Sequence, residues 1–166
     1  STRILNIGVG LGSRHYYNYG RGYNSRSTPA LSISYEQALG KKVGPGFVGL
    51  GGYFGFQRAT YRYNDYYFNN NKYYYQHSYT HLMLAFRAAY HLDALIFDKG
   101  EVYFGLMAGL RISTYKYENN SPDPFKDNYR YSGSSIWPAY SLFVGGRYYF
   151  TPKFGAFAEL GYGISY

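Results

Sequence analysis

Charged residues occur within strand-like runs that are otherwise apolar and rich in glycine. In residues 144–163, VGGRYYFTPKFGAFAELGYG, Arg147 precedes a Thr-Pro-Lys turn and Glu159 follows it. Folding the chain about this turn places the two residues opposite or diagonal to each other on one face. Because the planar fork of an arginine bonds a carboxylate at two points, the chemistry expected of this pair is a buried ion pair.

The same face of the other runs carries further charges. Alternation along each run assigns three acidic and three basic residues to this inner face, so their charges sum to zero. A hairpin folded about residue 96 also brings His91 near Glu101. Since an unpaired buried charge costs several kcal/mol, a balanced inward set predicts a paired network. The predicted members are Glu36, Arg87, His91, Glu101, Arg111, Arg147 and Glu159.

Seven runs position these residues, and all seven alternate in the same way. Large apolar side chains lie on one face, whereas glycine, alanine, serine, aromatic residues and a few charges lie on the other. A soluble barrel has the same period, but its second face would carry a solvated polar surface. The pattern therefore predicts an all-β, up-and-down antiparallel transmembrane β-barrel with an interior filled by side chains. The runs are residues 5–12, 31–36, 48–57, 81–91, 101–113, 139–148 and 154–165.

The composition favours one all-β domain over residues 1–166. Tyrosine (25), phenylalanine (12) and glycine (21) are abundant, and only 16% of residues are charged. No run reaches the roughly 18 apolar residues of a membrane helix. The absence of cysteine excludes disulfides, thiolate metal sites and cysteine nucleophiles. The start at Ser1, without a basic and apolar leader, fits a mature exported protein.

The connections between the runs alternate in length. Short connections lie near residues 41–45, 92–99 and 151–153, and long ones near 13–28, 58–76 and 115–133. This asymmetry predicts periplasmic turns at one end and extracellular loops at the other.

Pro138 cannot complete a ladder on both sides of a strand, so we place it at the outer rim near a bulge. Seven strands cannot close an even-numbered barrel, so we expect eight strands, with the closing strand missing from this sequence.

The long loops hold the candidate recognition residues. The net charge of +8 lies wholly outside the balanced inner set. Tyrosine, asparagine and arginine suit adaptable recognition of a protein or a glycan, and the same side chains also suit a passive role beside anionic lipid headgroups. The candidates are Arg14, Arg21, Arg26, Tyr66, Tyr67, Tyr73, Tyr74 and Tyr75.

Other chemistries find little support in the sequence. The four histidines do not stand at a recognised metal-ligand spacing, and the glycine pairs lack the strand-to-helix context of a phosphate loop. No spacing links the loop acids and histidines into a catalytic set. We therefore predict no enzyme activity, no cofactor, no metal and no nucleic-acid partner. The alternatives are a narrow ion-conducting pore and a soluble, lipocalin-like binding barrel.

Several segments resemble the outer-membrane β-barrel proteins that are abundant in Bacteroidota and related in architecture to the OmpA, OmpX and opacity-protein barrels. GRYYFTPKFGAFAELGYG (146–163) resembles their penultimate hairpin. NIGVGLGS (6–13), PALSISYE (29–36) and GPGFVGLGGYFGF (44–56) resemble their first three strands.

The resemblance implies an eight-stranded, porin-like monomer in the outer membrane of a Gram-negative envelope. Its partners would be outer-membrane lipid and lipopolysaccharide, with other outer-membrane proteins or surface glycans as further candidates. Because such barrels serve many purposes, the expected function is general. We expect a structural or recognition protein, or an accessory subunit of a larger envelope complex, that acts at the cell surface through its long loops.

Overall fold

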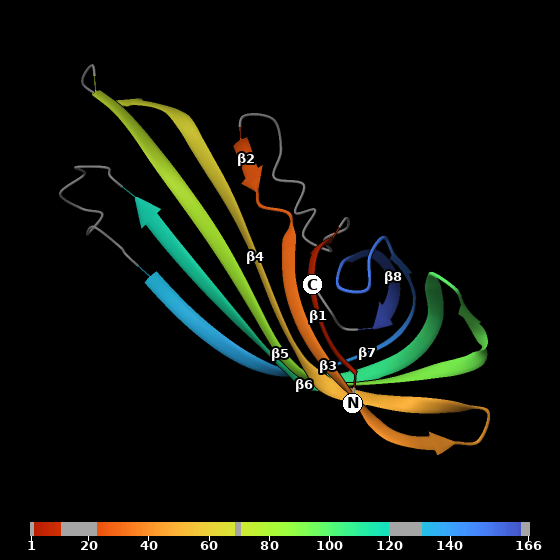
Figure 1. Ribbon diagram of the computed structural model, residues 1–166. Helices are drawn as coiled ribbons and strands as arrows, with labels where there is room; N and C mark the ends of the chain where they lie inside the picture. Colours follow the sequence, from red (N-terminus) through yellow and green to blue (C-terminus); the bar gives the residue numbers. More distant parts are fainter. Residues whose placement is uncertain (1, 11–22, 69–70, 120–130, 164–166) are drawn as a thin grey trace.

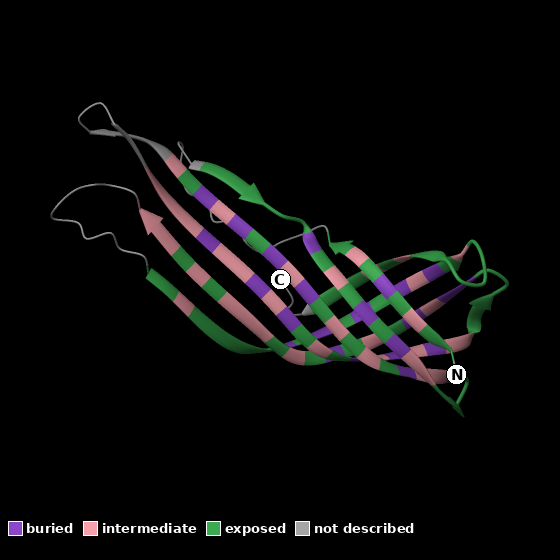
Figure 2. Cartoon of the chain, turned by 60° about the vertical axis from the view of Figure 1, so that its left-hand side comes forward, coloured by how far each residue is buried: buried purple, intermediate pink, exposed green. Residues whose placement is uncertain are grey.

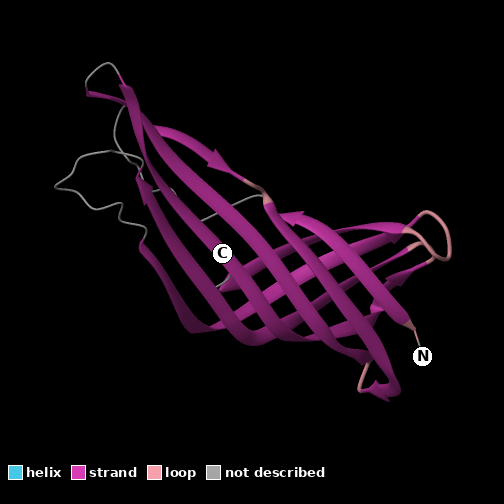
Figure 3. Cartoon of the chain, turned by 90° about the vertical axis from the view of Figure 1, so that its left-hand side faces the viewer, coloured by secondary structure: helices cyan, strands magenta, loops and turns pink. Residues whose placement is uncertain are grey.

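The protein forms one antiparallel β-sheet (Figure 3). A computed structural model describes residues 2–10, 23–68, 71–119 and 131–163, without the side chains of residues 23, 64–68, 71–73 and 163. In this part of the chain no helix is long and apolar enough to cross a membrane. The strands are β1 (Arg3–Gly10), β2 (Tyr23–Ser27), β3 (Ala30–Val43), β4 (Gly46–Phe68), β5 (Asn71–Phe97), β6 (Gly100–Asn119), β7 (Tyr131–Tyr149) and β8 (Gly155–Gly163).

Neighbours in the sheet follow chain order, which confirms the expected all-β antiparallel meander. The order is β1-β3-β4-β5-β6-β7-β8, and β2 pairs with β4. Strands β2 and β3 lie end to end along β4, because β2 pairs with residues 59–63 and β3 with residues 46–56. Between them, the Thr28 hydroxyl accepts a hydrogen bond from the Arg58 backbone N–H at 2.9 Å. The eight strands therefore occupy seven positions across the sheet.

More buried and more exposed residues alternate along the strands (Figure 2). This alternation separates an apolar outer face from an inner face that carries the charges of the network. On the outer face, Phe86 is 84% exposed and Leu160 is 79% exposed. On the inner face, the next residue of the same strand, Arg87, is 1% exposed. Successive side chains of a strand point to opposite faces, so the polarity predicted from the sequence pattern is confirmed.

The sheet curls around its inner face. Side chains from strands that are not neighbours in the sheet meet there: Glu36 of β3 bonds Arg147 of β7, and Arg87 of β5 bonds Glu159 of β8. The two edge strands also approach each other. A Cβ atom placed on Gly8 of β1 would lie 3.0 Å from the Phe157 ring of β8. Among the described residues, however, no backbone hydrogen bond joins β1 to β8, so the sheet is not closed into a hydrogen-bonded ring.

Several strands are longer than the sequence pattern predicts. The segment 58–76, expected as a loop, lies mostly in β4 and β5, whose hairpin projects far beyond β1 and β3 (Figure 1). Cross-strand tyrosine contacts explain the difference, because the rings of Tyr63 and Tyr75 stack with centroids 6.2 Å apart. At the other end, β5 continues to Phe97, so the expected 92–99 connection is a tight turn at residues 98–99.

The sequence predicts Pro138 at the outer rim, near a bulge. In the structure Pro138 instead lies within β7, and no bulge adjoins it in the β6–β7 ladder. It is paired with Leu110 in a β6–β7 register that runs without a shift from end to end. The described pairing between β7 and β8 begins only at Ser141. Pro138 therefore lies where β7 is paired on one side in the described structure, which is the setting in which a strand tolerates proline.

Candidate functional site

A network of charged side chains fills the inner face near the short-turn end of the sheet. Because every second side chain of a strand points to the same face, charged residues from five strands can converge on this inner face. Three carboxylates meet three cations, and all but Glu159 belong to residues that are buried. The members are Glu36 of β3, Arg87 and His91 of β5, Glu101 of β6, Arg147 of β7 and Glu159 of β8.

Four of these residues form a closed ring. The Arg147 guanidinium donates to Glu36 Oε2 at 3.0 Å and to Glu101 Oε1 at 2.9 Å. On the other side, His91 Nε2 lies 2.6 Å from Glu36 Oε1 and His91 Nδ1 lies 2.7 Å from Glu101 Oε2. Each carboxylate is thus bridged to both cations, which satisfies the buried charges of both partners.

The geometry around His91 makes this residue a cation. Both of its ring nitrogens face carboxylate oxygens, and both can donate only when the imidazole is doubly protonated. Its ring stacks on Phe47 with an interplanar angle of 2° and centroids 4.6 Å apart. With His91 charged, the three cations Arg87, His91 and Arg147 balance the three carboxylates.

A second cluster extends the network to β8. Arg87 bonds both oxygens of Glu159, through Nη2 at 2.5 Å and Nη1 at 3.0 Å. The Tyr103 hydroxyl donates to Glu159 Oε1 at 2.6 Å. The Arg87 guanidinium also lies 3.9 Å from the centre of the Phe143 ring, so its planar face is covered as well as its edge.

Glycine on the inner face makes room for this network. A Cβ atom on Gly145 would lie 2.7 Å from both Glu159 Cγ and Tyr103 Cζ. A Cβ atom on Gly49 would lie 2.4 Å from Glu36 Oε1. Real side chains do not approach so closely, so the small residues of this face leave the volume that the long charged side chains fill.

The structure does not bring Arg111 into the network with the other six predicted members. No described carboxylate pairs with Arg111, whose Nε atom is buried without a hydrogen-bond partner. The sequence pattern predicts Arg111 as the third cation, whereas His91 takes that place in the structure. The supporting hydroxyls of Tyr103 and Tyr149 were not predicted, and the Tyr149 hydroxyl donates to Glu101 at 2.9 Å. Tyr103 shares the inner parity of Glu101 on β6, which was the available signal.

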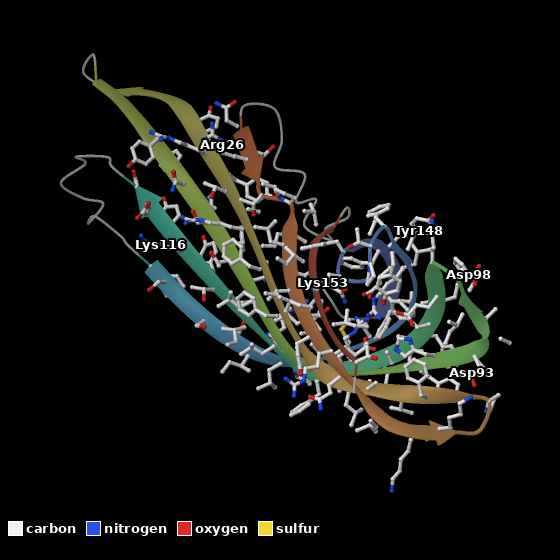
Figure 4. The ribbon with its side chains drawn as sticks, in the orientation of Figure 1. Arg26, Asp93, Asp98, Lys116, Tyr148 and Lys153 are labelled. Carbon is white, nitrogen blue, oxygen red and sulfur yellow. The ribbon has the colours of Figure 1, made fainter. Side chains whose placement is uncertain are left out.

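The loop recognition candidates are only partly described. Arg26 is exposed on β2, and Tyr74 and Tyr75 lie on β5 and not in a loop. Figure 4 shows Arg26 and Lys116 at one end of the molecule and Asp93 and Asp98 at the other. Tyr66 and Tyr67 of β4 and Tyr73 of β5 are strand residues whose side chains lie outside the described set. Arg14 and Arg21 lie outside the described residues altogether.

The arrangement is suited to holding strands together. Within the described ranges no group of three or more histidine, aspartate or glutamate residues could hold a metal ion. The carboxylates of the network are already engaged by arginine, histidine or tyrosine, and the network is electrically balanced. Such a closed set joins distant strands without presenting a free nucleophile or base.

Comparisons with protein-family models, with curated proteins and with solved structures gave no match to this chain. Its function must therefore be inferred from the sheet and its two faces.

Proposed function

We propose that this protein is an integral β-barrel of a bacterial outer membrane, with a side-chain-filled interior and a structural or recognition role at the cell surface. The observation that carries the proposal is a sharp boundary on the outer face. One ladder row across six strands is wholly apolar, and it consists of Val9, Leu31, Phe56, Leu82, Ile112 and Ile136. The next outer-face row is polar, and it consists of Arg58, Thr80, Thr114 and Ser134.

The apolar band below this boundary has the dimensions of a bilayer core. On β5 it covers residues 82–92, which matches the roughly 9 to 11 residues of a tilted membrane strand. Exposed aromatic residues, among them Phe97, Tyr148 and Phe154, lie toward the short-turn end of the band. Aromatic rings are enriched at membrane interfaces, where one end of the ring is apolar and the other is wet.

Basic side chains lie just beyond the boundary on the outer face. Arg26 of β2 pairs in register with Thr60, between Arg58 and Arg62 of β4, and all three arginines are exposed. Guanidinium groups at this depth can bond the phosphates of lipid headgroups or lipopolysaccharide. This placement supports outer-membrane lipid as a partner and the projecting hairpins as the extracellular end.

The direction of the edge strands limits how this sheet could close into a barrel. Strand β1 is antiparallel to β3, and the alternation continues through β7 to β8, so β1 and β8 run in the same direction. An antiparallel sheet can join these two edges only through one strand of opposite direction between them. Because unpaired backbone is not tolerated in hydrocarbon, we infer such a closing strand, which gives eight positions.

The charge network favours a structural role over conduction. It crosses the inner face from β3 to β7 and from β5 to β8, where a pore would need water. A narrow eight-position barrel has room for side chains or for a channel, but not for both. The protein would therefore act as a rigid membrane anchor whose projecting hairpins contact partners, including those of a larger envelope assembly.

Migration on a detergent gel tests the proposal. The protein should be extracted from membranes only by detergent, and unheated samples should migrate at a different position from boiled ones, because a closed barrel resists unfolding by the detergent. If the unaltered protein dissolves in buffer without detergent and migrates at the same position before and after boiling, the membrane assignment is overturned.

A further inference from the structure

The inner face continues beyond the apolar boundary, and there it becomes aromatic. The row Tyr61, His77, Tyr117 and Tyr131 runs in register across β4 to β7. We name the inner-facing aromatic residues of this extension the vestibule. They are Tyr61, Tyr63, Tyr75, His77, Tyr79, Tyr115, Tyr117, Tyr131 and Trp137. Tyr131 is 63% exposed and Trp137 is 56% exposed, so solvent reaches this surface.

Two polar side chains at the base of the vestibule have unsatisfied atoms. Arg111 lies beside Trp137 in the β6–β7 ladder, and its Nε atom is buried without a hydrogen-bond partner. Gln57 of β4 is 4% exposed, and its Oε1 atom also lacks a partner. Their strands are two positions apart, a separation of about 10 Å. The Nε atoms of Arg87 and Arg147 also lack a partner, but other guanidinium nitrogens of those two residues bond carboxylates, whereas no described carboxylate bonds Arg111. Buried polar groups are nearly always bonded, so Arg111 and Gln57 together point to a ligand that supplies the missing partners.

The charge and shape of the surface specify the chemistry of that ligand. On the described inner face beyond the boundary, Arg111 faces no aspartate or glutamate, so the complementary group is an anion. The guanidinium group of an arginine binds a carboxylate through two parallel hydrogen bonds. The same described face has no leucine, isoleucine, valine or phenylalanine and thus offers no pocket for an apolar peptide side chain. Tyrosine and tryptophan rings instead offer flat faces with polar edges, which suit the C–H faces and hydroxyls of a sugar.

We propose that the vestibule binds an acidic saccharide, with its carboxylate on Arg111, one of its polar groups on Gln57, and its rings against the aromatic wall. This inference deepens the proposed function and rests on it, because the vestibule must open to the outside of the cell. The binding surface is then built from strands β4 to β7 and not from the connecting loops.

The sole tryptophan of the chain reports on this site. Because Trp137 is the register neighbour of Arg111, a bound saccharide should change its fluorescence. The full chain, folded in detergent micelles, would be titrated with tetragalacturonate and with the fully methyl-esterified tetramer. We expect a saturable change with the acid and at least about tenfold weaker binding of the neutral ester. Equal affinity for the two tetramers, or no saturable binding, would overturn the proposal.

Matched arginine variants locate the carboxylate. Arg111→Met should weaken tetragalacturonate binding by at least about tenfold, and Arg111→Lys should retain part of the affinity. Arg3→Met provides the control, because Arg3 is exposed on β1, toward the short-turn end of the sheet, and it should bind as the unaltered protein does. Equal loss in the Arg111→Met and Arg3→Met variants would contradict the site. Tetraglutamate that binds as tightly as tetragalacturonate would overturn the saccharide class.

The gel test separates failure of this inference from failure of the membrane assignment. The same preparations would be run heated and unheated. A sample that shows the two gel positions but does not bind the acidic tetramer overturns the vestibule proposal alone. A sample that binds the tetramer but is soluble without detergent overturns the membrane assignment and leaves the binding site standing.

Discussion

Replacing Arg147 with methionine is expected to lower the free energy of unfolding in lipid vesicles by about 3 to 5 kcal/mol. Arg147 is the only arginine that bonds both Glu36 and Glu101 among the described residues. Both of these residues are buried, with 2% and 7% of their surface exposed. Methionine fills much of the volume but removes the hydrogen bonds from Arg147 to Glu36 and Glu101. The two carboxylates then share the His91 imidazolium, with only Arg87 Nε remaining at 3.7 Å from Glu36, and this under-compensated buried charge is the source of the loss.

Urea unfolding in vesicles, followed by tyrosine fluorescence, would measure the effect. Lys42→Met provides the control, because the Lys42–Asp93 pair is exposed and should contribute only about 0 to 1 kcal/mol. If Arg147→Met does not refold, combining it with Glu36→Gln should restore folding by removing one stranded charge. An Arg147→Met protein as stable as the Lys42→Met protein would contradict the network.

Replacing Phe86 with arginine is expected to destabilise the protein by about 2 to 4 kcal/mol in a bilayer. Phe86 lies midway along the apolar stretch of β5, and it is 84% exposed on the outer face. In water, an arginine at so exposed a position would change stability by less than about 0.5 kcal/mol. The size of the loss therefore reports the solvent that surrounds the outer face.

The matched variant is Thr114→Arg, on the same outer face but beyond the apolar boundary. Thr114 is exposed, and it lies one ladder row past Ile112. An arginine there reaches the headgroup region and should cost about 0 to 1 kcal/mol. Both variants would be unfolded with urea from vesicles of one composition. Equal, small losses at Phe86 and Thr114 would mean that the band does not lie in hydrocarbon.

The faces of the strands were predictable from the sequence because they depend only on parity. Once Leu84 and Phe86 share one face, Arg87 must lie on the other, whatever the neighbouring strands do. The same holds for the alternation of β6 around Glu101 and of β7 around Arg147. This local rule explains why six of the seven predicted inner residues meet in the structure.

The partners within the network were not predictable, because they depend on how the sheet curls. Arg147 and Glu159 share a hairpin and an inner face, and the sequence suggested that they pair. In the structure Arg147 is opposite Phe157, and its bonds go to Glu101 on one side and to Glu36 across the interior. Parity cannot reveal contacts between strands that are not neighbours.

The ends of the strands were the least predictable part of the fold. Beyond the boundary the outer face is polar and the inner face is aromatic, so the apolar alternation used to recognise a strand disappears. Tyr63 and Tyr75 therefore resembled loop residues, although tyrosine favours strands and their rings stack across β4 and β5. The break between β2 and β3 at Thr28 was hidden for the same reason.

Accessibility of a nitroxide label measures the environment of the outer face directly. The chain contains no cysteine, so Phe86→Cys and Thr114→Cys would each carry a single label, in vesicles, exposed in turn to oxygen and to a water-soluble nickel chelate. If the outer band faces hydrocarbon, the label at Phe86 should collide mainly with oxygen and the label at Thr114 mainly with nickel. A label at Phe86 that meets nickel as freely as the label at Thr114 would contradict the membrane barrel.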